Sequence, residues 1–130
     1  MTILLGYKPS DLGEAALQRA IEEALRHKAR LVVLNVARGD SAIEDTRLTD
    51  PQAEELQRLL TESGIDFEVE RLVEPGDAAE EIIEAAERLD AELIVIGMRH
   101  RTAVGKLILG SEAQRILMHA SCPVLAVKVP

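Results

Sequence analysis

The stretch AELIVIGMRHRTAVGKLILGSEAQRI, residues 91–116, decides how this chain folds. It opens on an apolar run that ends at Gly97 and closes on the pair Gly110-Ser111, followed by residues at helical spacing. A short apolar run without strict alternation is typical of a strand buried on both faces of a parallel sheet. The stretch therefore predicts a buried strand, a loop with glycines and basic residues, and a helix.

The same alternation of strand and helix extends outward from this stretch. We expect strands at 2–7, 29–37, 67–73, 91–97 and 122–129. The alternating character of 67–73 indicates an edge strand, and 91–97, the most apolar run, is expected to be central. Five strands and four helices in alternation predict one domain, residues 1–130, with a doubly wound α/β fold and right-handed crossovers.

Capping residues predict where the four helices begin and end. The predicted starts are Ser10, Asp50 followed by Pro51, Asp77 with Glu80, and Ser111 with Gln114, and Gly64 is expected to end the second helix. Helical spacing predicts three inward faces: Leu17, Ala20, Ile21 and Ala24; Ala79, Ile82, Ile83 and Ala86; Ala113, Ile116, Leu117 and Ala120.

The composition indicates a protein of the cytoplasm. Of its 130 residues 47% are hydrophobic, with one Tyr, one Phe and no Trp, so the core must be built from aliphatic side chains. Cys122 is the only cysteine, which excludes a framework of intramolecular disulfides. The first residues do not form a signal peptide, and apolar runs are too short to span a membrane.

The charge distribution favours a small anion as the ligand. The net charge of −8 argues against broad binding to nucleic acid or to an anionic membrane. Residues 97–130 nevertheless contain Arg99, Arg101, Lys106, Arg115 and Lys128, with Glu112 as their only acidic residue. Positive charge is thus concentrated in residues 97–130, which include the glycine loop.

The loop after residues 91–97 is the expected binding place, because ligands of open parallel sheets lie outside the carboxyl ends of the strands. Gly97 would let a ligand approach the backbone, and Gly110-Ser111 would open a helix whose free N–H groups attract anions. A P-loop is excluded, because His100 and Leu107 replace its first glycine and its Ser or Thr. The first predicted strand lacks the dinucleotide-binding glycine pattern, since GYKPSDLG follows it.

GMRHRTAVGKLILGS, residues 97–111, resembles the G-x2-G-x9-G-[ST] signature of the universal stress proteins. Gly97 takes the first place, His100 the second, and Gly110-Ser111 the last two. The resemblance extends to ILLGYKPS and LVVLNV near the start and to AQRILMHASCPVLAVK at the end, so it covers nearly the whole chain. It implies the adenine nucleotide alpha-hydrolase-like form of the predicted fold, with the five strands in the order 3-2-1-4-5.

The resemblance also implies a site for ATP, ADP or AMP, with Mg²⁺ as an optional companion, since one branch of the family binds ATP through this loop. Carried over by position, the nucleotide-binding residues are Gly6, Lys8, Val36, Gly97, Arg99, His100, Arg101, Lys106, Gly110, Ser111 and Glu112. Gly6 and Lys8 would lie at the adenine with Val36 as an apolar wall, and the residues from Gly97 onward would surround the ribose and phosphates.

Three residues depart from the nucleotide-binding branch and leave a second interpretation open. Lys8 replaces an aspartate that accepts a hydrogen bond from the adenine amino group, and an ammonium group can only donate. His100 adds a side chain in the place of a glycine, and Glu112 brings a carboxylate to the anion-binding end of the helix. The alternative is a dimeric interaction module that binds no nucleotide.

The resemblance further implies a homodimer formed through residues 123–129, which as an unpaired edge strand would otherwise expose its backbone groups. An unknown protein partner is expected, because the leading hypothesis is a stress-response regulator whose ATP-bound and free states differ in what they bind. No catalytic residue is predicted, so ATP hydrolysis would be slow at most. No His, Cys or carboxylate group has the spacing of a metal site.

Overall fold

Strands and helices alternate along the chain as predicted, with one added pair of short strands. The computed structural model describes residues 1–38, 47–74, 77–98, 101–103, 106–108 and 110–129; for 38, 74, 101–103 and 106–108 it describes the backbone only. The elements are β1 Thr2–Gly6, α1 Asp11–His27, β2 Arg30–Arg38, α2 Asp50–Ser63, β3 Phe67–Glu74, α3 Ala78–Arg88, β4 Leu93–Met98, β5 Arg101–Ala103, β6 Lys106–Ile108, α4 Ser111–His119 and β7 Val124–Lys128.

The five long strands form one parallel sheet in the order β3-β2-β1-β4-β7. This confirms the predicted order, with β7 as the fifth strand, and β3 lies at an edge as its alternating sequence indicated. The prediction that 91–97 is the central strand is wrong, because β1 holds the middle and β4 lies between β1 and β7. Every interior strand is covered on both faces, so its apolar character does not reveal its rank in the sheet.

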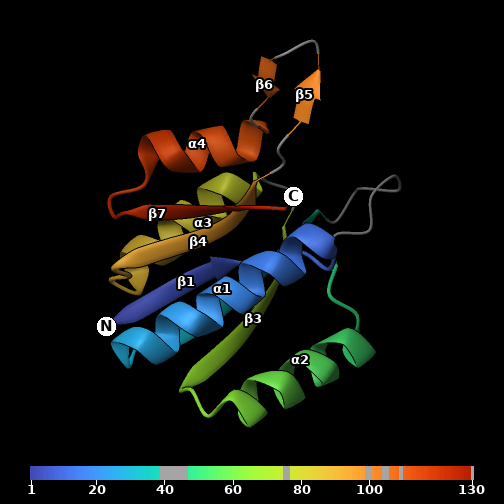
Figure 1. Cartoon of the computed structure of the whole chain (residues 1–130), viewed down its shortest axis with the longest axis vertical. Helices are drawn as coiled ribbons and strands as arrows, with labels where there is room; N and C mark the ends of the chain where they lie inside the picture. The colour runs from blue at the N-terminus through green and yellow to red at the C-terminus, as the bar shows by residue number, and fades with distance from the viewer. Residues whose placement is uncertain (39–46, 75–76, 99–100, 104–105, 109, 130) are drawn as a thin grey trace.

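Two helices cover each face of the sheet (Figure 1). Alternate residues of β1 point to opposite faces, so that Ile3 and Leu5 pack with α1 and α2, whereas Leu4 packs with α3 and α4. The two hydrophobic clusters are aliphatic almost throughout, as the composition required. Because all strands run in the same direction, their carboxyl ends and the starts of α1 and α4 lie at one edge of the sheet.

Capping residues define the helix ends, with two corrections. Ser10 caps α1, and the cap of α3 is Asp77, whose side chain accepts a hydrogen bond from the Ala79 N–H, as predicted. Helix α2 ends at Gly64, which adopts a left-handed φ of 79°. Its N-cap, however, is Thr49 rather than Asp50, because the Thr49 hydroxyl forms a capping box with Gln52.

The second correction concerns α4. Gly110 is its N-cap and Ser111 its first helical residue, so Ser111 does not cap the helix. Ala113 and Ile116 are buried as predicted, but Leu117 is 41% exposed. Fewer strands lie beneath a helix near the edge of a sheet, so fewer of its residues are buried than the helical spacing of apolar residues predicts.

Strands β5 and β6 form an antiparallel ribbon that the sequence analysis treated as loop. They pair Arg101 with Ile108 and Ala103 with Lys106. Figure 1 shows the ribbon standing beyond the carboxyl ends of β4 and β7, above the start of α4. Three-residue strands are too short to produce a detectable periodicity, which explains why the pattern was missed.

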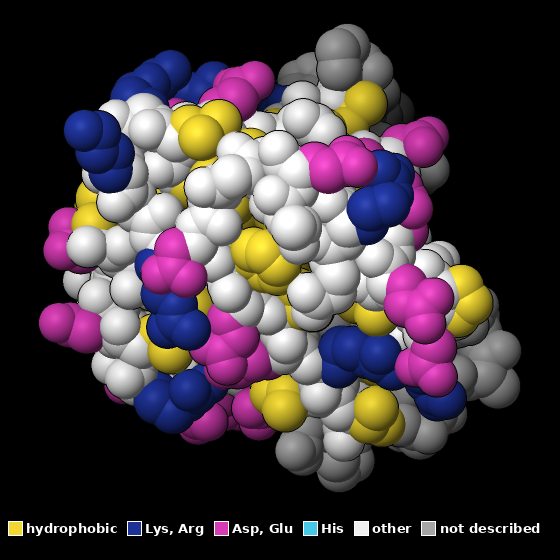
Figure 2. Space-filling model, turned by 90° about the horizontal axis from the view of Figure 1, so that it is seen from below, with side chains coloured by type: hydrophobic (Ala, Val, Ile, Leu, Met, Phe, Trp, Pro, Cys, Tyr) yellow, Lys and Arg dark blue, Asp and Glu magenta, His cyan; other side chains and the backbone are white. Residues whose placement is uncertain are grey.

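The surface mixes both signs of charge. On the face shown in Figure 2, Lys and Arg side chains alternate with Asp and Glu. Ion pairs such as Arg58 to Glu62 at 2.8 Å and Arg71 to Asp50 at 2.8 Å contribute to this pattern. In the parts of the chain that the structure describes, no helix is both long and apolar enough to cross a membrane.

Candidate functional site

A cavity of about 470 Å³ lies at the carboxyl ends of β1 and β4, between the first turns of α1 and α4. This is the edge where ligands of open parallel sheets bind, and the volume is that of a small-molecule site. The described lining residues are Gly6, Lys8, Pro9, Ser10, Asp11, Leu12, Gly13, Ile96, Gly97, Gly110, Glu112, Ala113 and Ile116. The cavity thus has a floor of strand ends and two walls of helix starts.

The wall formed by α1 depends on Gly13, which the sequence analysis missed. The Ser10 hydroxyl caps the helix by accepting the Gly13 N–H at 3.0 Å. A Cβ at residue 13 would lie 1.8 Å from the carbonyl oxygen of Lys8. An internal glycine in an amphipathic helix is a signal of close backbone approach, and the GYKPSDLG stretch carried that signal.

Asn35 fixes the chain next to this wall. Its side chain is fully buried; the amide donates to the Tyr7 carbonyl at 2.9 Å, and its oxygen accepts the Leu48 N–H at 3.0 Å. The buried Tyr7 hydroxyl donates to Glu14 on α1. Burial and this hydrogen bond raise the pKa of Tyr7 above its ordinary value. These contacts hold the segment that carries Lys8 at the end of β1.

The wall formed by α4 presents free backbone donors. Its N-cap is Gly110, which has no side chain. The first N–H groups of the helix therefore donate no hydrogen bond to an N-cap side chain. The helix dipole adds positive character at the same end. Arg115, one turn further, forms an ion pair with Asp77 at the start of α3 and so ties the two helices together.

The glycines at the cavity differ in what they permit. A Cβ at Gly97 would meet the Leu12 Cγ at 2.6 Å and the Leu12 carbonyl oxygen at 3.1 Å, so packing of α1 on β4 already requires this glycine. A Cβ at Gly110 would meet no described atom within 4 Å, and its backbone angles, φ −63° and ψ 149°, suit any residue. Among the described residues, neither packing nor backbone conformation requires a glycine at 110.

An ion pair joins the turn after β1 to the wall formed by α4. The Lys8 Nζ lies 2.6 Å from the Glu112 Oε2, and the two residues are 104 positions apart in the sequence. Their side chains are 41% and 34% exposed, so water reaches both groups. The Lys8 side chain therefore extends from the end of β1 to the start of α4.

The structure brings together part of the predicted site. Gly6, Lys8, Gly97, Gly110 and Glu112 line the cavity. Val36 is buried in the core on the α3 and α4 side, and Ser111 is exposed at the start of α4; neither is among the described lining residues. Arg99 and His100 lie outside the described residues, and for Arg101 and Lys106 only the backbone, in β5 and β6, is described.

The described lining combines hydrogen-bond donors, apolar surface and the two carboxylates of Asp11 and Glu112. Backbone N–H groups and Lys8 offer donors, while Leu12, Ile96 and Ile116 supply apolar surface. Within the described ranges, no three His, Cys, Asp or Glu residues are grouped so that they could hold a metal ion. Cys122 is half-buried near the start of β7, and burial raises its pKa.

The strand order and the cavity at the carboxyl ends define an α/β protein with the adenine nucleotide alpha-hydrolase-like fold. The sequence profile of the Universal stress protein family matches residues 1–128, and the chain belongs to this family. It is 43% identical over 126 residues to a universal stress protein of Mycolicibacterium smegmatis, covering 97% of this chain and 96% of that protein.

Two solved structures from Archaeoglobus fulgidus share the fold. A universal stress protein superimposes with a TM-score of 0.73 and 28% identity over 98% of this chain and 97% of the other. A universal stress protein in complex with dAMP superimposes with a TM-score of 0.67 and 25% identity over 98% and 96%. The predicted family and strand order are therefore confirmed.

Proposed function

We propose that this universal stress protein binds ATP, ADP or AMP in the cavity between α1 and α4. Binding would make it a cytoplasmic stress-response regulator that switches its interactions, rather than an efficient enzyme. The observation that carries the proposal is Gly110, an N-cap glycine that borders the cavity and that neither its backbone conformation nor packing against the described residues requires. A phosphate close to the backbone would explain it.

The surroundings of Gly110 support a phosphate group. The uncapped N–H groups of α4 and its dipole favour an anion, and Lys8 places a cation at the same helix end. The basic residues of 99–106 supply further positive charge in sequence. The apolar lining residues could hold a base or a ribose, and Mg²⁺ could accompany the polyphosphate.

The relative solved in complex with dAMP supports an adenine nucleotide as the ligand class. It covers nearly the whole of this chain at 25% identity. Its ligand belongs to the class that the resemblance to the universal stress proteins implied. We infer the same class of ligand for this chain.

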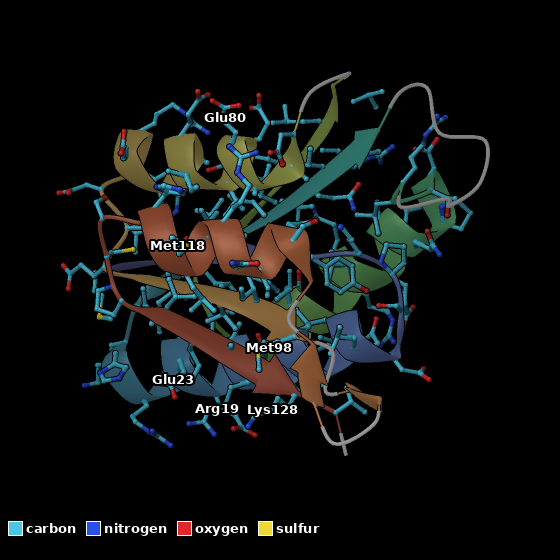
Figure 3. All side chains as sticks on the ribbon, turned by 90° about the horizontal axis from the view of Figure 1, so that it is seen from above. Arg19, Glu23, Glu80, Met98, Met118 and Lys128 are labelled. Atoms are coloured by element: carbon cyan, nitrogen blue, oxygen red, sulfur yellow. The ribbon has the colours of Figure 1, made fainter. Side chains whose placement is uncertain are left out.

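We also propose a homodimer formed through β7. This strand pairs with β4 on one side and is an edge of the sheet as described. Figure 3 looks onto this edge, with α4 on one side of β7 and α1 on the other, and shows Met118 on α4. Met118 is 69% exposed and Leu117 41%, so apolar surface flanks the open edge. A second copy would cover both.

Isothermal titration with ATP, ADP, AMP and adenosine tests the proposed ligand, with and without Mg²⁺. We expect binding at sub-millimolar affinity that weakens as phosphates are removed. The absence of heat with all four would refute the proposal and favour the interaction module. Mass spectrometry of small molecules released by heating the purified protein gives an independent readout, and a phosphate-release assay should show slow turnover at most.

Sedimentation or light scattering at micromolar concentration tests the dimer. Ala126→Pro would remove a backbone donor from β7, while Met118→Gln would only reduce the apolar surface beside it. We expect the first variant to weaken association more than the second, provided that both remain folded. A monomeric mass for the unmodified protein would contradict the dimer without affecting the proposed ligand.

A further inference from the structure

Lys8 is the only cationic side chain among the described residues that line the cavity. Its ammonium group lies 2.6 Å from the carboxylate of Glu112, the second residue of α4. The pair spans the cavity from the end of β1 to the helix start where an anion would bind. Any phosphate at the first turn of α4 would therefore approach a cation that already has a partner.

Backbone contacts fix the position of the segment that carries Lys8. Gly13 lies directly against the Lys8 carbonyl, and the Ser10 hydroxyl caps the helix that follows. Glu112 belongs to a helix whose start is tied to α3 by the ion pair of Arg115 with Asp77. Separate contacts thus hold the backbone at Lys8 and the backbone at Glu112. To break the ion pair, only the two side chains need to move.

The ion pair is weak enough to be exchanged. Both side chains are about one-third or more exposed, and ion pairs that water reaches contribute little to stability. A phosphate group carries more negative charge than a carboxylate and can accept several hydrogen bonds, so it is the stronger partner for an ammonium group. Glu112, in contrast, would lie beside the phosphate and repel it.

We propose that Lys8 is a phosphate-binding residue, not a base-reading one, and that Glu112 competes with the phosphate for it. The inference rests on the proposed nucleotide site and specifies how that site discriminates. Binding moves the ammonium group from the Glu112 carboxylate to the phosphate, and the released carboxylate turns to water. Only a ligand with enough negative charge displaces the Glu112 carboxylate from Lys8, so Glu112 selects against weakly charged ligands.

Two simpler explanations make different predictions. If the ion pair only stabilises the shape of the cavity, Lys8→Met and Glu112→Gln should change the affinity for ATP in the same direction. If the two residues act only through the overall electric field, their effects should be opposite but independent of one another. Partner exchange requires opposite effects that depend on one another, which a double-mutant cycle measures.

The experiment titrates the full-length protein, Lys8→Met, Glu112→Gln and the double variant with ATP, tripolyphosphate and adenosine. We expect Lys8→Met to weaken ATP and tripolyphosphate roughly tenfold and Glu112→Gln to tighten both roughly threefold to tenfold, since removing a competing charge affects only the charged ligands. In the Lys8→Met background the gain from Glu112→Gln should largely disappear. Adenosine should bind all four proteins alike.

The outcomes separate this inference from the proposed function. If the unmodified protein binds ATP but the two single effects share a direction or add independently, the inference is wrong and the proposed function stands. If the unmodified protein binds neither ATP nor adenosine, the proposed function fails. Tripolyphosphate binding that appears with Glu112→Gln would then still support the competition, and its absence would refute it. Thermal unfolding of each variant shows that it is folded.

Discussion

The backbone of Gly13 lies directly against the carbonyl group of Lys8, so that a Cβ on residue 13 would lie 1.8 Å from the Lys8 oxygen. The contact joins the first turn of α1 to the turn that follows β1. It explains why a helix that otherwise favours Ala and Leu contains a glycine near its start. It also connects stability to the site, because the same turn carries the cation of the cavity.

Replacing Gly13 with Ala should destabilise the protein although Ala is the better helix former. The clash is with backbone, which cannot move aside without shifting residues 8–10, and overpacking of this kind costs about 1–3 kcal/mol. Urea denaturation measures the loss. Gln18→Ala, at an exposed position of the same helix, should change the free energy of unfolding by less than about 0.5 kcal/mol. A Gly13→Ala protein more stable than the original would show that helix propensity prevails.

Replacing Gly97 with Ala should also be destabilising, through Leu12. The new methyl group would lie 2.6 Å from the Leu12 Cγ, so we expect a loss of about 1–3 kcal/mol. Leu12→Ala removes that atom, and the double variant should therefore lose less than the sum of the two single losses. Strict additivity in urea denaturation would mean that the two residues do not interact.

Replacing Gly110 with Ala should affect binding more than stability. No described atom lies near the new methyl group, so the free energy of unfolding should change by less than about 1 kcal/mol. If phosphate approaches this backbone, ATP should bind roughly tenfold more weakly, a loss of about 1.4 kcal/mol. Titration and urea denaturation of the same preparation measure both. Unchanged affinity would remove Gly110 as a ligand contact.

Replacing Asn35 with Ala should be strongly destabilising. Two buried backbone groups, the Tyr7 carbonyl and the Leu48 N–H, would lose the partners at 2.9 and 3.0 Å. With about 1–3 kcal/mol for each unpaired group, we expect a loss of about 2–6 kcal/mol. Hydrogen exchange of the Leu48 amide provides a local readout, and undiminished protection there would contradict the role given to Asn35.

Tyr7 should resist ionisation in the folded protein. It is the only tyrosine, and the chain has no tryptophan, so absorbance at alkaline pH reports on Tyr7 alone. Burial, then the hydrogen bond to Glu14, raises its pKa above the value of about 10 that it has when unfolded. The stability that this shift contributes is present below about pH 10 and is lost as the pH rises through the folded-state pKa.

A spectrophotometric titration should therefore show tyrosinate in urea near pH 10 but not in the native protein at that pH. Glu14→Gln removes the negative charge beside the hydroxyl and should lower the native pKa of Tyr7 part of the way. Superimposable native and denatured titrations would show that Tyr7 is accessible to water.

Local patterns were sufficient for much of the fold. Apolar runs such as 29–37 predicted strands, and Ser10 and Asp77 predicted helix starts, because strand burial and capping depend on neighbours in sequence. The same patterns failed where two candidates stand side by side. Thr49 precedes Asp50 and Gly110 precedes Ser111, and a shift of one residue decides which of them is the cap.

The location of the candidate site could be predicted from the sequence, but most of its side-chain contacts could not. The spacing of Gly97 and Gly110 located the edge of the sheet where the cavity lies. It could not show that Leu12 fills the space beside Gly97, whereas no described atom lies within 4 Å of a Cβ at Gly110. Those differences depend on how α1 and α4 pack, which periodicity does not specify.

The sequence by itself determined the family, the order of strands and helices along the chain, and the segment that borders the cavity. Only the tertiary structure decided that β5 and β6 form a ribbon, that Gly13 supports the turn after β1, and that Lys8 meets Glu112 across 104 residues. The reason is physical: capping and burial depend on nearby residues, whereas a contact between distant side chains requires that every strand and helix between them has found its place.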